Sequence, residues 1–204
     1  MKALSLETTR PVELYAHNLL QTALHNHTPL NEKEYATHLN YAYVKTESLE
    51  NRGINTENLN STVTANGRIW TPERETLHKE IINDFLTDWD MVPLNREAVL
   101  SGGLAGGGKT TTLTQHTHFN LNNYAFLSPD DVKEKMSEKD MFPSIRGLTT
   151  MEASALGYEE SCYITNLLFQ DCLKAGRNLI YDTTMGSRLA VDAKLEPMRE
   201  HGYT

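Results

Sequence analysis

Residues 103–110 read Gly-Leu-Ala-Gly-Gly-Gly-Lys-Thr and match the pattern G-x-x-x-x-G-K-[ST]. An apolar run at 98–100 precedes them, so the sequence indicates a strand, a glycine-rich loop and then a helix. Glycines let backbone N–H groups surround phosphate oxygens, and the start of a helix adds positive partial charge. The stretch therefore predicts a P-loop for a nucleoside triphosphate, with ATP and Mg²⁺ as the expected pair.

Individual roles follow from this pattern. Lys109 is expected to reach the β- and γ-phosphates, and the Thr110 hydroxyl to bind Mg²⁺. The alternative, a glycine-rich turn with an incidental lysine, is disfavoured by the flanking strand and helix. The expected nucleotide-binding set is Gly103, Gly106, Gly107, Gly108, Lys109, Thr110 and Thr111.

Two further apolar runs, 124–127 and 178–181, end in polar residues. Between them lies a helical stretch from about Met151 to Ala175, which Gly176 closes. Strands that alternate with helices predict a parallel sheet with helices on both faces. We therefore expect residues 95–204 to form an α/β domain of the P-loop kinase type.

Residues 1–94 are predicted to be a mainly helical region of unknown role. Pro11 is expected to open one helix, and Asn31 with Glu34 to cap a second, whose apolar face is Tyr35, Leu39 and Tyr43. A polar loop over 51–66 and a short hairpin at Asn66-Gly67 follow. Thr71-Pro72 then begins a helix whose apolar stripe is Leu77, Ile81, Phe85 and Trp89.

Acidic residues follow the second and third strands. Asp130-Asp131 comes after the second, where a carboxylate can accept a proton from an attacking hydroxyl or can simply begin a helix. Asp182 follows the third, as a Mg²⁺-binding carboxylate or a turn acid. Glu159-Glu160 alone reads as the solvated start of a helix.

The overall composition limits the class of protein. A net charge of −8 argues against general nucleic-acid binding. Cys162 and Cys172 lie ten residues apart on one predicted helix, roughly 15 Å, so we expect buried reduced thiols. The sequence shows no zinc-type spacing, membrane span or signal peptide, so we expect a cytoplasmic protein.

Four segments, in this order after the P-loop, resemble the zeta-toxin family of P-loop kinases. They are Ser-Pro-Asp-Asp-Val-Lys at 128–133, Met-Glu-Ala-Ser at 151–154, Tyr-Glu-Glu-Ser at 158–161, and Gly-Arg-Asn-Leu-Ile-Tyr-Asp-Thr-Thr-Met at 176–185. The resemblance covers roughly residues 74–204 and is greatest to the actinobacterial and phage members.

The resemblance implies a kinase that transfers the ATP γ-phosphate to a small hydroxyl acceptor, which in relatives is UDP-N-acetylglucosamine. Asp130 takes the position of the catalytic base, beside Lys109. The acceptor-binding residues would be Glu159, Glu160 and Asp131, and the metal-binding residues Thr110 and Asp182. An antitoxin protein is a possible partner.

Two departures from the family pattern concern the acceptor and the catalytic arginines. Tyr158 stands where the family usually has histidine, so acceptor contacts are expected to differ. The family's arginines follow a further strand, so we expect the native chain to continue past Thr204. Arg146, Arg177 and Arg188 are candidates for this task, and no spacing assigns it to one of them.

Other classes of P-loop protein stay open. One alternative is a P-loop kinase for another metabolite or a nucleic-acid end. Another is a nucleotide-dependent binding or regulatory module, with the N-terminal half as its partner-binding part. A GTPase is disfavoured, since the sequence has no Asn-Lys-x-Asp motif.

Overall fold

The computed structural model describes residues 21–23, 25–26, 28–103 and 120–204. The chain divides into two compact units, each made of two separate segments. The N-terminal unit comprises Met1–Glu75 and Lys133–Glu160, and the sheet unit comprises Thr76–Val132 and Ser161–Thr204. This division differs from the boundary expected between residues 94 and 95, because the second segment of the N-terminal unit packs against α2 (Glu32–Glu50).

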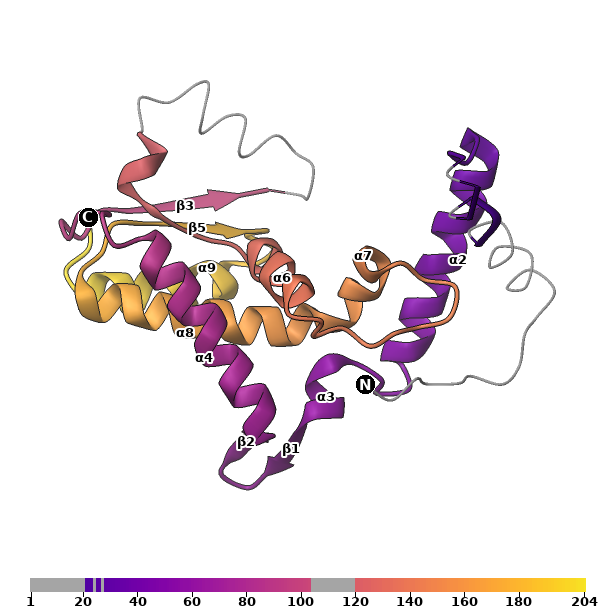
Figure 1. Ribbon diagram of the computed structural model, residues 1–204. Coiled ribbons are helices and arrows are strands. Elements are labelled where there is room, and N and C mark those ends of the chain that lie inside the picture. The colour runs from indigo at the N-terminus through magenta and orange to yellow at the C-terminus, as the bar shows by residue number, and fades with distance from the viewer. Residues whose placement is uncertain (1–20, 24, 27, 104–119) are drawn as a thin grey trace. The chain divides into compact units, whose positions relative to one another are not determined.

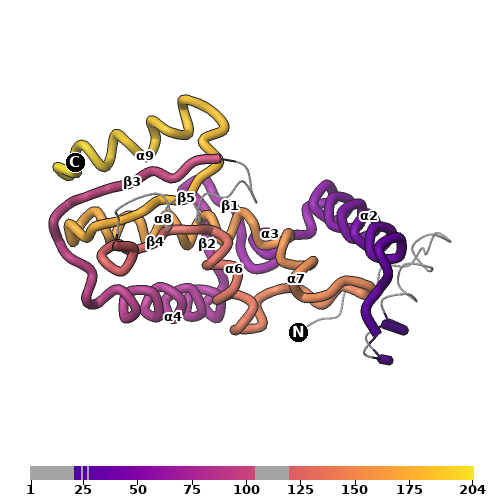
Figure 2. Tube along the Cα trace, turned by 90° about the horizontal axis from the view of Figure 1, so that it is seen from above, coloured from indigo at the N-terminus to yellow at the C-terminus, as the bar shows by residue number. Residues whose placement is uncertain are grey.

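The sheet unit contains three parallel strands in the order β3-β5-β4. Figure 1 labels β3 and β5, and Figure 2 labels all three strands. They are β3 (Ala98–Gly102), β4 (Ala125–Leu127) and β5 (Leu179–Thr183). A short 3-10 helix, η1 (Leu121–Asn123), precedes β4. The central strand β5 is the most deeply buried, as expected for a sheet covered on both faces. The predicted α/β fold with a parallel sheet is therefore confirmed.

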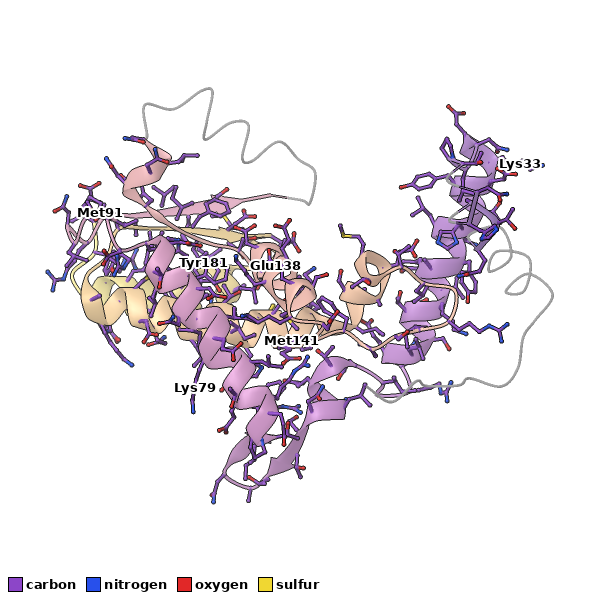
Figure 3. All side chains as sticks on the ribbon, in the orientation of Figure 1. Lys33, Lys79, Met91, Glu138, Met141 and Tyr181 are labelled. Atoms are coloured by element: carbon purple, nitrogen blue, oxygen red, sulfur yellow. The ribbon has the colours of Figure 1, made fainter. Side chains whose placement is uncertain are left out.

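Helices α8 (Tyr158–Ala175) and α9 (Arg188–Glu200) run alongside these strands (Figures 1 and 2). Both contact Tyr181 of β5, which Figure 3 labels. The Phe169 ring of α8 meets the Tyr181 ring edge-on, with 5.2 Å between centroids, and Lys194 Nζ of α9 lies 4.6 Å from the Tyr181 ring. Burial lowers the pKa of Lys194. The two helices therefore cover the same face of the sheet.

The outer edge of β3 carries one additional backbone pairing. The Thr204 N–H donates to the Arg96 carbonyl at 3.0 Å, and the Ala98 N–H donates to the Thr204 carbonyl at 3.0 Å. This is the hydrogen-bond pattern of a parallel ladder. The Tyr203 hydroxyl lies 2.8 Å from the Cys172 carbonyl and 2.7 Å from that of Arg177, which fixes the segment before Thr204.

Both cysteines lie on α8 as free thiols, as predicted. Cys172 is buried, but Cys162 is only half-buried, so the prediction of burial holds for one of the two. Burial raises the pKa of the Cys172 thiol to about 12, which makes this residue a packing element rather than a nucleophile.

Gly176 ends α8, as predicted, with φ +72°. A Cβ atom at this position would also lie 3.2 Å from Cζ of Arg96. We therefore expect Gly176→Ala to lower the free energy of unfolding by about 1–2 kcal/mol, measured by urea denaturation. Gly186→Ala is the control, since its Cβ would meet only the Thr184 hydroxyl at 3.6 Å. Equal stability of the two variants would contradict this explanation.

The N-terminal unit has a small apolar core formed by Leu49, Ile145 and Leu156, with Ile54 and Leu148 packed against it. Its elements are α2, α3 (Thr56–Asn60), β1 (Ser61–Thr64), β2 (Gly67–Trp70), α7 (Thr150–Ala153) and the 3-10 helix η2 (Ser154–Gly157). Three of the described helices contribute residues to both units: α4 (Pro72–Asp88), α6 (Pro129–Glu138) and α8. The long helix expected over 151–175 is thus divided into α7, η2 and α8.

Helix α2 begins with the predicted capping box at Asn31 and Glu34. The prediction of its buried face was wrong, because Tyr35, Leu39 and Tyr43 are 55%, 43% and 66% exposed. The buried face instead consists of His38, Tyr41, Ala42, Thr46 and Leu49. Two polar side chains on this face make hydrogen bonds. His38 Nε2 lies 2.6 Å from Glu152 Oε1, and the Thr46 hydroxyl donates to the Ala42 carbonyl.

The loop predicted over 51–66 contains α3 and β1, so this prediction was wrong. The hairpin is present, but its two turn residues are Ala65 and Asn66, and Thr64 pairs with Gly67. The Thr64 hydroxyl donates to the Gly67 carbonyl at 2.7 Å and accepts from the Asn66 N–H. These two bonds stabilise a turn that lies one residue before the predicted one.

Helix α4 begins at Pro72 as predicted, with the Thr71 hydroxyl accepting from the Arg74 N–H. In its predicted stripe, Ile81, Phe85 and Trp89 are buried and Leu77 is half-buried. The helix predicted to open at Pro11 lies outside the described residues. Within the described part of the chain, every helix is too short or too polar to cross a bilayer.

Candidate active site

The carboxyl ends of the three strands place predicted site residues along one edge of the sheet. Ser101 of β3 pairs with Asp182 of β5, and Leu127, the last residue of β4, pairs with Tyr181. Asp182 follows Tyr181 on the central strand β5, so it lies one residue beyond the last pair that β5 makes with β4. This edge is where open α/β sheets bind ligands.

The P-loop begins at this edge. The Gly103 N–H donates to the Thr183 carbonyl at 3.3 Å, and Gly103 has φ +148°, which suits glycine. At Gly102, a Cβ atom would lie 2.2 Å from Met185 Sδ, so a larger residue here would require the Met185 side chain to move. The rest of the predicted nucleotide-binding set, 106–111 with Lys109 and Thr110, lies outside the described residues.

Asp130 lies in the first turn of α6, directly after β4. The Ser128 hydroxyl accepts from the Asp130 N–H at 3.2 Å, and the Ser128 carbonyl accepts from the Val132 N–H. The capping interpretation of this segment is therefore realised, while the Asp130 side chain stays exposed. Both interpretations are compatible, because the cap uses the Ser128 hydroxyl and the Asp130 backbone N–H, and not the Asp130 carboxylate. Asp131 is half-buried in the same turn.

Asp182 is half-buried at the end of β5, and its Oδ1 atom is buried. The next residue, Thr183, accepts a hydrogen bond from the Met185 N–H through its hydroxyl at 3.4 Å. Carboxylate and hydroxyl oxygens are the donors that Mg²⁺ prefers. The described residues contain no cluster of three or more His, Cys, Asp or Glu side chains that would hold a metal by itself. The chemistry of Asp182 suits a Mg²⁺ ligand, and its assignment to the metal stays a prediction.

In the N-terminal unit, Glu160 forms a buried ion pair with Arg74. Arg74 Nε lies 2.6 Å from Glu160 Oε1, and its Nη2 lies 2.7 Å from Oε2 and 2.8 Å from the Met141 carbonyl. Glu160 is fully buried and Arg74 is 6% exposed. The solvated-face interpretation is therefore wrong for Glu160, and its assignment as an acceptor contact stays a prediction.

Glu159, by contrast, is exposed and lines a cavity of about 460 Å³. The lining residues are Glu50, Asn55, Lys133, Ala155, Leu156, Tyr158 and Glu159, all within the N-terminal unit. Lys133 Nζ lies 5.9 Å from the centroid of the Tyr158 ring. The predicted acceptor-binding residue Glu159 is thus found in a cavity, next to the tyrosine that departs from the zeta-toxin pattern.

The candidate arginines lie in three different environments. Arg177 precedes β5, at the end of the strand opposite to Asp182, and its Nη1 donates to the Trp89 carbonyl. Arg188 is 95% exposed and forms an ion pair with Asp192 at 3.4 Å. Arg146 is exposed in the N-terminal unit. This structure therefore gives no support to Arg177 as a group on the transferring phosphate.

Three polar lining residues escaped the sequence analysis: Glu50, Asn55 and Lys133. Arg74 was missed as well. The Arg74–Glu160 pair joins positions 86 residues apart, and no local pattern marks it. Lys133 was quoted only as the last residue of a family segment, and no signal marked Glu50 or Asn55.

Comparison with known proteins gives a structural neighbour and a family match. The search of curated proteins found no match. One solved structure, from the characterisation of the PezAT chromosomal toxin–antitoxin system of Streptococcus pneumoniae, is similar at 17% sequence identity and a TM-score of 0.49. The match covers 63% of this chain and 53% of that chain, so this chain spans about half the length of its neighbour.

A protein-family comparison identifies residues 99–204, more than half of the chain. The matching family is described as an AAA domain. Its range includes the P-loop, Asp130 and all of β4 and β5, and it agrees with the parallel sheet. The chain therefore belongs to the AAA domain family, as a P-loop nucleotide-binding protein.

Proposed function

We propose that this chain is an ATP-dependent kinase that transfers the γ-phosphate to a hydroxyl group of a small acceptor. One observation carries the proposal: the first residue of the P-loop, Gly103, and the carboxylates Asp130 and Asp182 lie at the carboxyl ends of the three parallel strands, on the same edge of the sheet. A nucleotide-binding loop, a base and a metal ligand are the parts that phosphoryl transfer requires.

In this proposal, Asp130 accepts the proton of the acceptor hydroxyl as its oxygen attacks the γ-phosphorus. The bond from that phosphorus to the β–γ bridging oxygen breaks, and ADP leaves. Lys109 neutralises charge on the β- and γ-phosphates, and Thr110 and Asp182 hold Mg²⁺. When bound, Mg²⁺ neutralises the charge that develops on the phosphate oxygens.

The zeta-toxin resemblance of 128–133, 158–161 and 176–185 supports UDP-N-acetylglucosamine as the first acceptor to examine. Glu159 and Asp131 are proposed acceptor contacts, with Glu160 a further candidate. The same resemblance supports an antitoxin-like protein partner and a cytoplasmic location, where ATP and nucleotide sugars are present.

We expect ADP production from Mg-ATP to rise when UDP-N-acetylglucosamine is added, measured by a coupled ADP assay with mass spectrometry of the product. Lys109→Ala is expected to abolish this activity and to weaken Mg-ATP binding, measured by calorimetry. In this proposal the lysine contacts the phosphates both in bound ATP and in the transition state. Lys79→Ala, an exposed lysine on α4, is the matched control. An acceptor panel that never stimulates ADP production would reject the kinase.

A second candidate function is a nucleotide-dependent binding module. The exposed apolar face of α2, formed by Tyr35, Leu39 and Tyr43, favours it, because exposed apolar patches often mark protein interfaces. In this case, ATP would change affinity for a protein partner, while ADP production would not depend on any small acceptor.

A further inference from the structure

Met185, two residues after the end of β5, has a backbone conformation that is unusual for its residue type. Its φ angle is +50°, in the left-handed region. Residues other than glycine rarely adopt this region, because the Cβ atom then comes too close to the backbone. Such a conformation persists only where the surrounding structure holds it, and such residues cluster at functional sites. Met185 is therefore a candidate for a role at the ligand-binding edge of the sheet.

The Met185 side chain lies directly against Gly102, the last residue of β3. A Cβ atom at Gly102 would lie 2.2 Å from Sδ, 2.4 Å from Cγ and 2.8 Å from Cε of Met185. Gly102 is part of a regular strand, a conformation that alanine adopts without strain. The Met185 side chain, and not the backbone conformation of Gly102, therefore disfavours a larger residue at position 102.

Thr183 connects the turn that contains Met185 to the first residue of the P-loop. It pairs with Gly102 in the parallel ladder between β3 and β5, which end side by side (Figure 1). Its carbonyl accepts from the Gly103 N–H at 3.3 Å, and its hydroxyl accepts from the Met185 N–H at 3.4 Å. The start of the P-loop and the turn after β5 are therefore held together by backbone pairing, hydrogen bonds and side-chain packing, all within the sheet unit.

The direction in which the chain leaves β3 matters for a P-loop. Such a loop binds phosphate through backbone N–H groups that point inward, and it binds more tightly when this arrangement exists before the ligand arrives. Two consecutive glycines, Gly102 and Gly103, give the chain unusual conformational freedom at this point. The flexible thioether side chain of Met185 fills the space that the missing side chain of Gly102 leaves, and so restricts that freedom.

We infer that Met185 is a positioning residue of the nucleotide site. Its side chain packs on Gly102 and holds the first residues of the P-loop in the conformation that binds the phosphates of Mg-ATP. The inference rests on the proposed nucleotide site, and not on kinase activity or on the identity of an acceptor. It gives a role to a residue that the sequence placed only at the end of the segment 176–185.

The first test replaces Met185 in the full chain and measures the Kd for Mg-ATP by calorimetry. Met185→Ala is expected to weaken binding about tenfold, because the start of the P-loop is then no longer held before the nucleotide binds. Met185→Leu is expected to bind within about twofold of the wild type, because leucine and methionine have similar volumes. Met91→Ala, which truncates a methionine that is 89% exposed in the same unit, is the matched control.

The second test changes the same contact from the other side. Gly102→Ala places a Cβ atom where the Met185 side chain lies, so that side chain must move, and we expect Mg-ATP binding to weaken about tenfold. In Gly102→Ala/Met185→Ala the new methyl group enters space that is already vacated. The double variant should therefore bind within about threefold of either single variant, whereas independent effects would multiply to about a hundredfold.

Urea denaturation of each variant separates positioning from packing. A lower free energy of unfolding in Met185→Ala with an unchanged Kd for Mg-ATP would show that Met185 only packs, and would overturn the inference. Multiplied effects in the double variant would overturn it as well, because the two residues would then act independently.

The outcomes also separate this inference from the proposed function. A wild-type chain that does not bind Mg-ATP rejects the nucleotide site and the role of Met185 together. Wild-type binding that Met185→Ala leaves unchanged rejects the role of Met185 alone. Binding that depends on Met185, without acceptor-stimulated ADP production, supports this role and rejects the kinase.

Discussion

Asp130→Asn is expected to lower acceptor phosphorylation by about 10²–10⁴-fold, the usual contribution of a general base. The asparagine keeps the size of the side chain and the Ser128 cap on the backbone, so the fold should be unchanged. Affinity for Mg-ATP is expected to stay within about twofold, because the base acts on the acceptor proton and not on the triphosphate. Initial rates and calorimetric titration measure the two quantities.

Glu134→Gln provides the control for Asp130→Asn. It lies on the same helix, is exposed, and loses the same charge. If Asp130→Asn phosphorylates the acceptor at the wild-type rate, Asp130 is not the general base. If nucleotide in addition altered affinity for a protein partner, the binding-module interpretation would replace the kinase.

Arg74→Met is expected to lower the free energy of unfolding by about 3–5 kcal/mol. The substitution leaves the fully buried Glu160 without the guanidinium that satisfies both its oxygens, and leaves the Met141 carbonyl without its donor. An uncompensated buried charge is among the most costly single changes in a protein interior. Urea unfolding at neutral pH measures the effect.

Two comparisons make this test specific. Arg68→Met breaks the Arg68–Glu57 pair, whose side chains are 25% and 20% exposed, and should cost no more than about 1 kcal/mol. The double variant Arg74→Met/Glu160→Met removes both charges and should recover most of the lost stability. Equal losses for Arg68→Met and Arg74→Met would show that burial does not decide the strength of these pairs.

The sheet was predictable from sequence because its signals are local. Three apolar runs, each ended by a polar turn, and the glycine at 176 act over a few residues, and the structure reproduces them. Asp130 and Asp182 could be placed at the same edge of the sheet because parallel strands bring their carboxyl ends together. The family match over 99–204 covers the same segment.

The N-terminal unit was harder to predict, because contacts between residues far apart in the sequence determine which of its side chains are buried. Tyr35, Leu39 and Tyr43 are apolar by type yet exposed, whereas His38 is buried through its pairing with Glu152, 114 residues away. A buried polar residue with a remote partner leaves no periodic signal along one helix. The cavity around Glu159 needed Glu50 and Asn55 from a segment that sequence patterns described only as the end of a helix and a loop.

Each of the two compact units is built from two separate segments, and this determines which fragments of the chain keep a unit intact. Neither unit corresponds to one continuous stretch of sequence, since residues 133–160 belong with the N-terminal segment although they interrupt the other unit. A fragment that starts at residue 76 would retain Glu160 but lack Arg74. Chimeras with related proteins should therefore exchange both segments of a unit together, so that each buried charge keeps its counterpart.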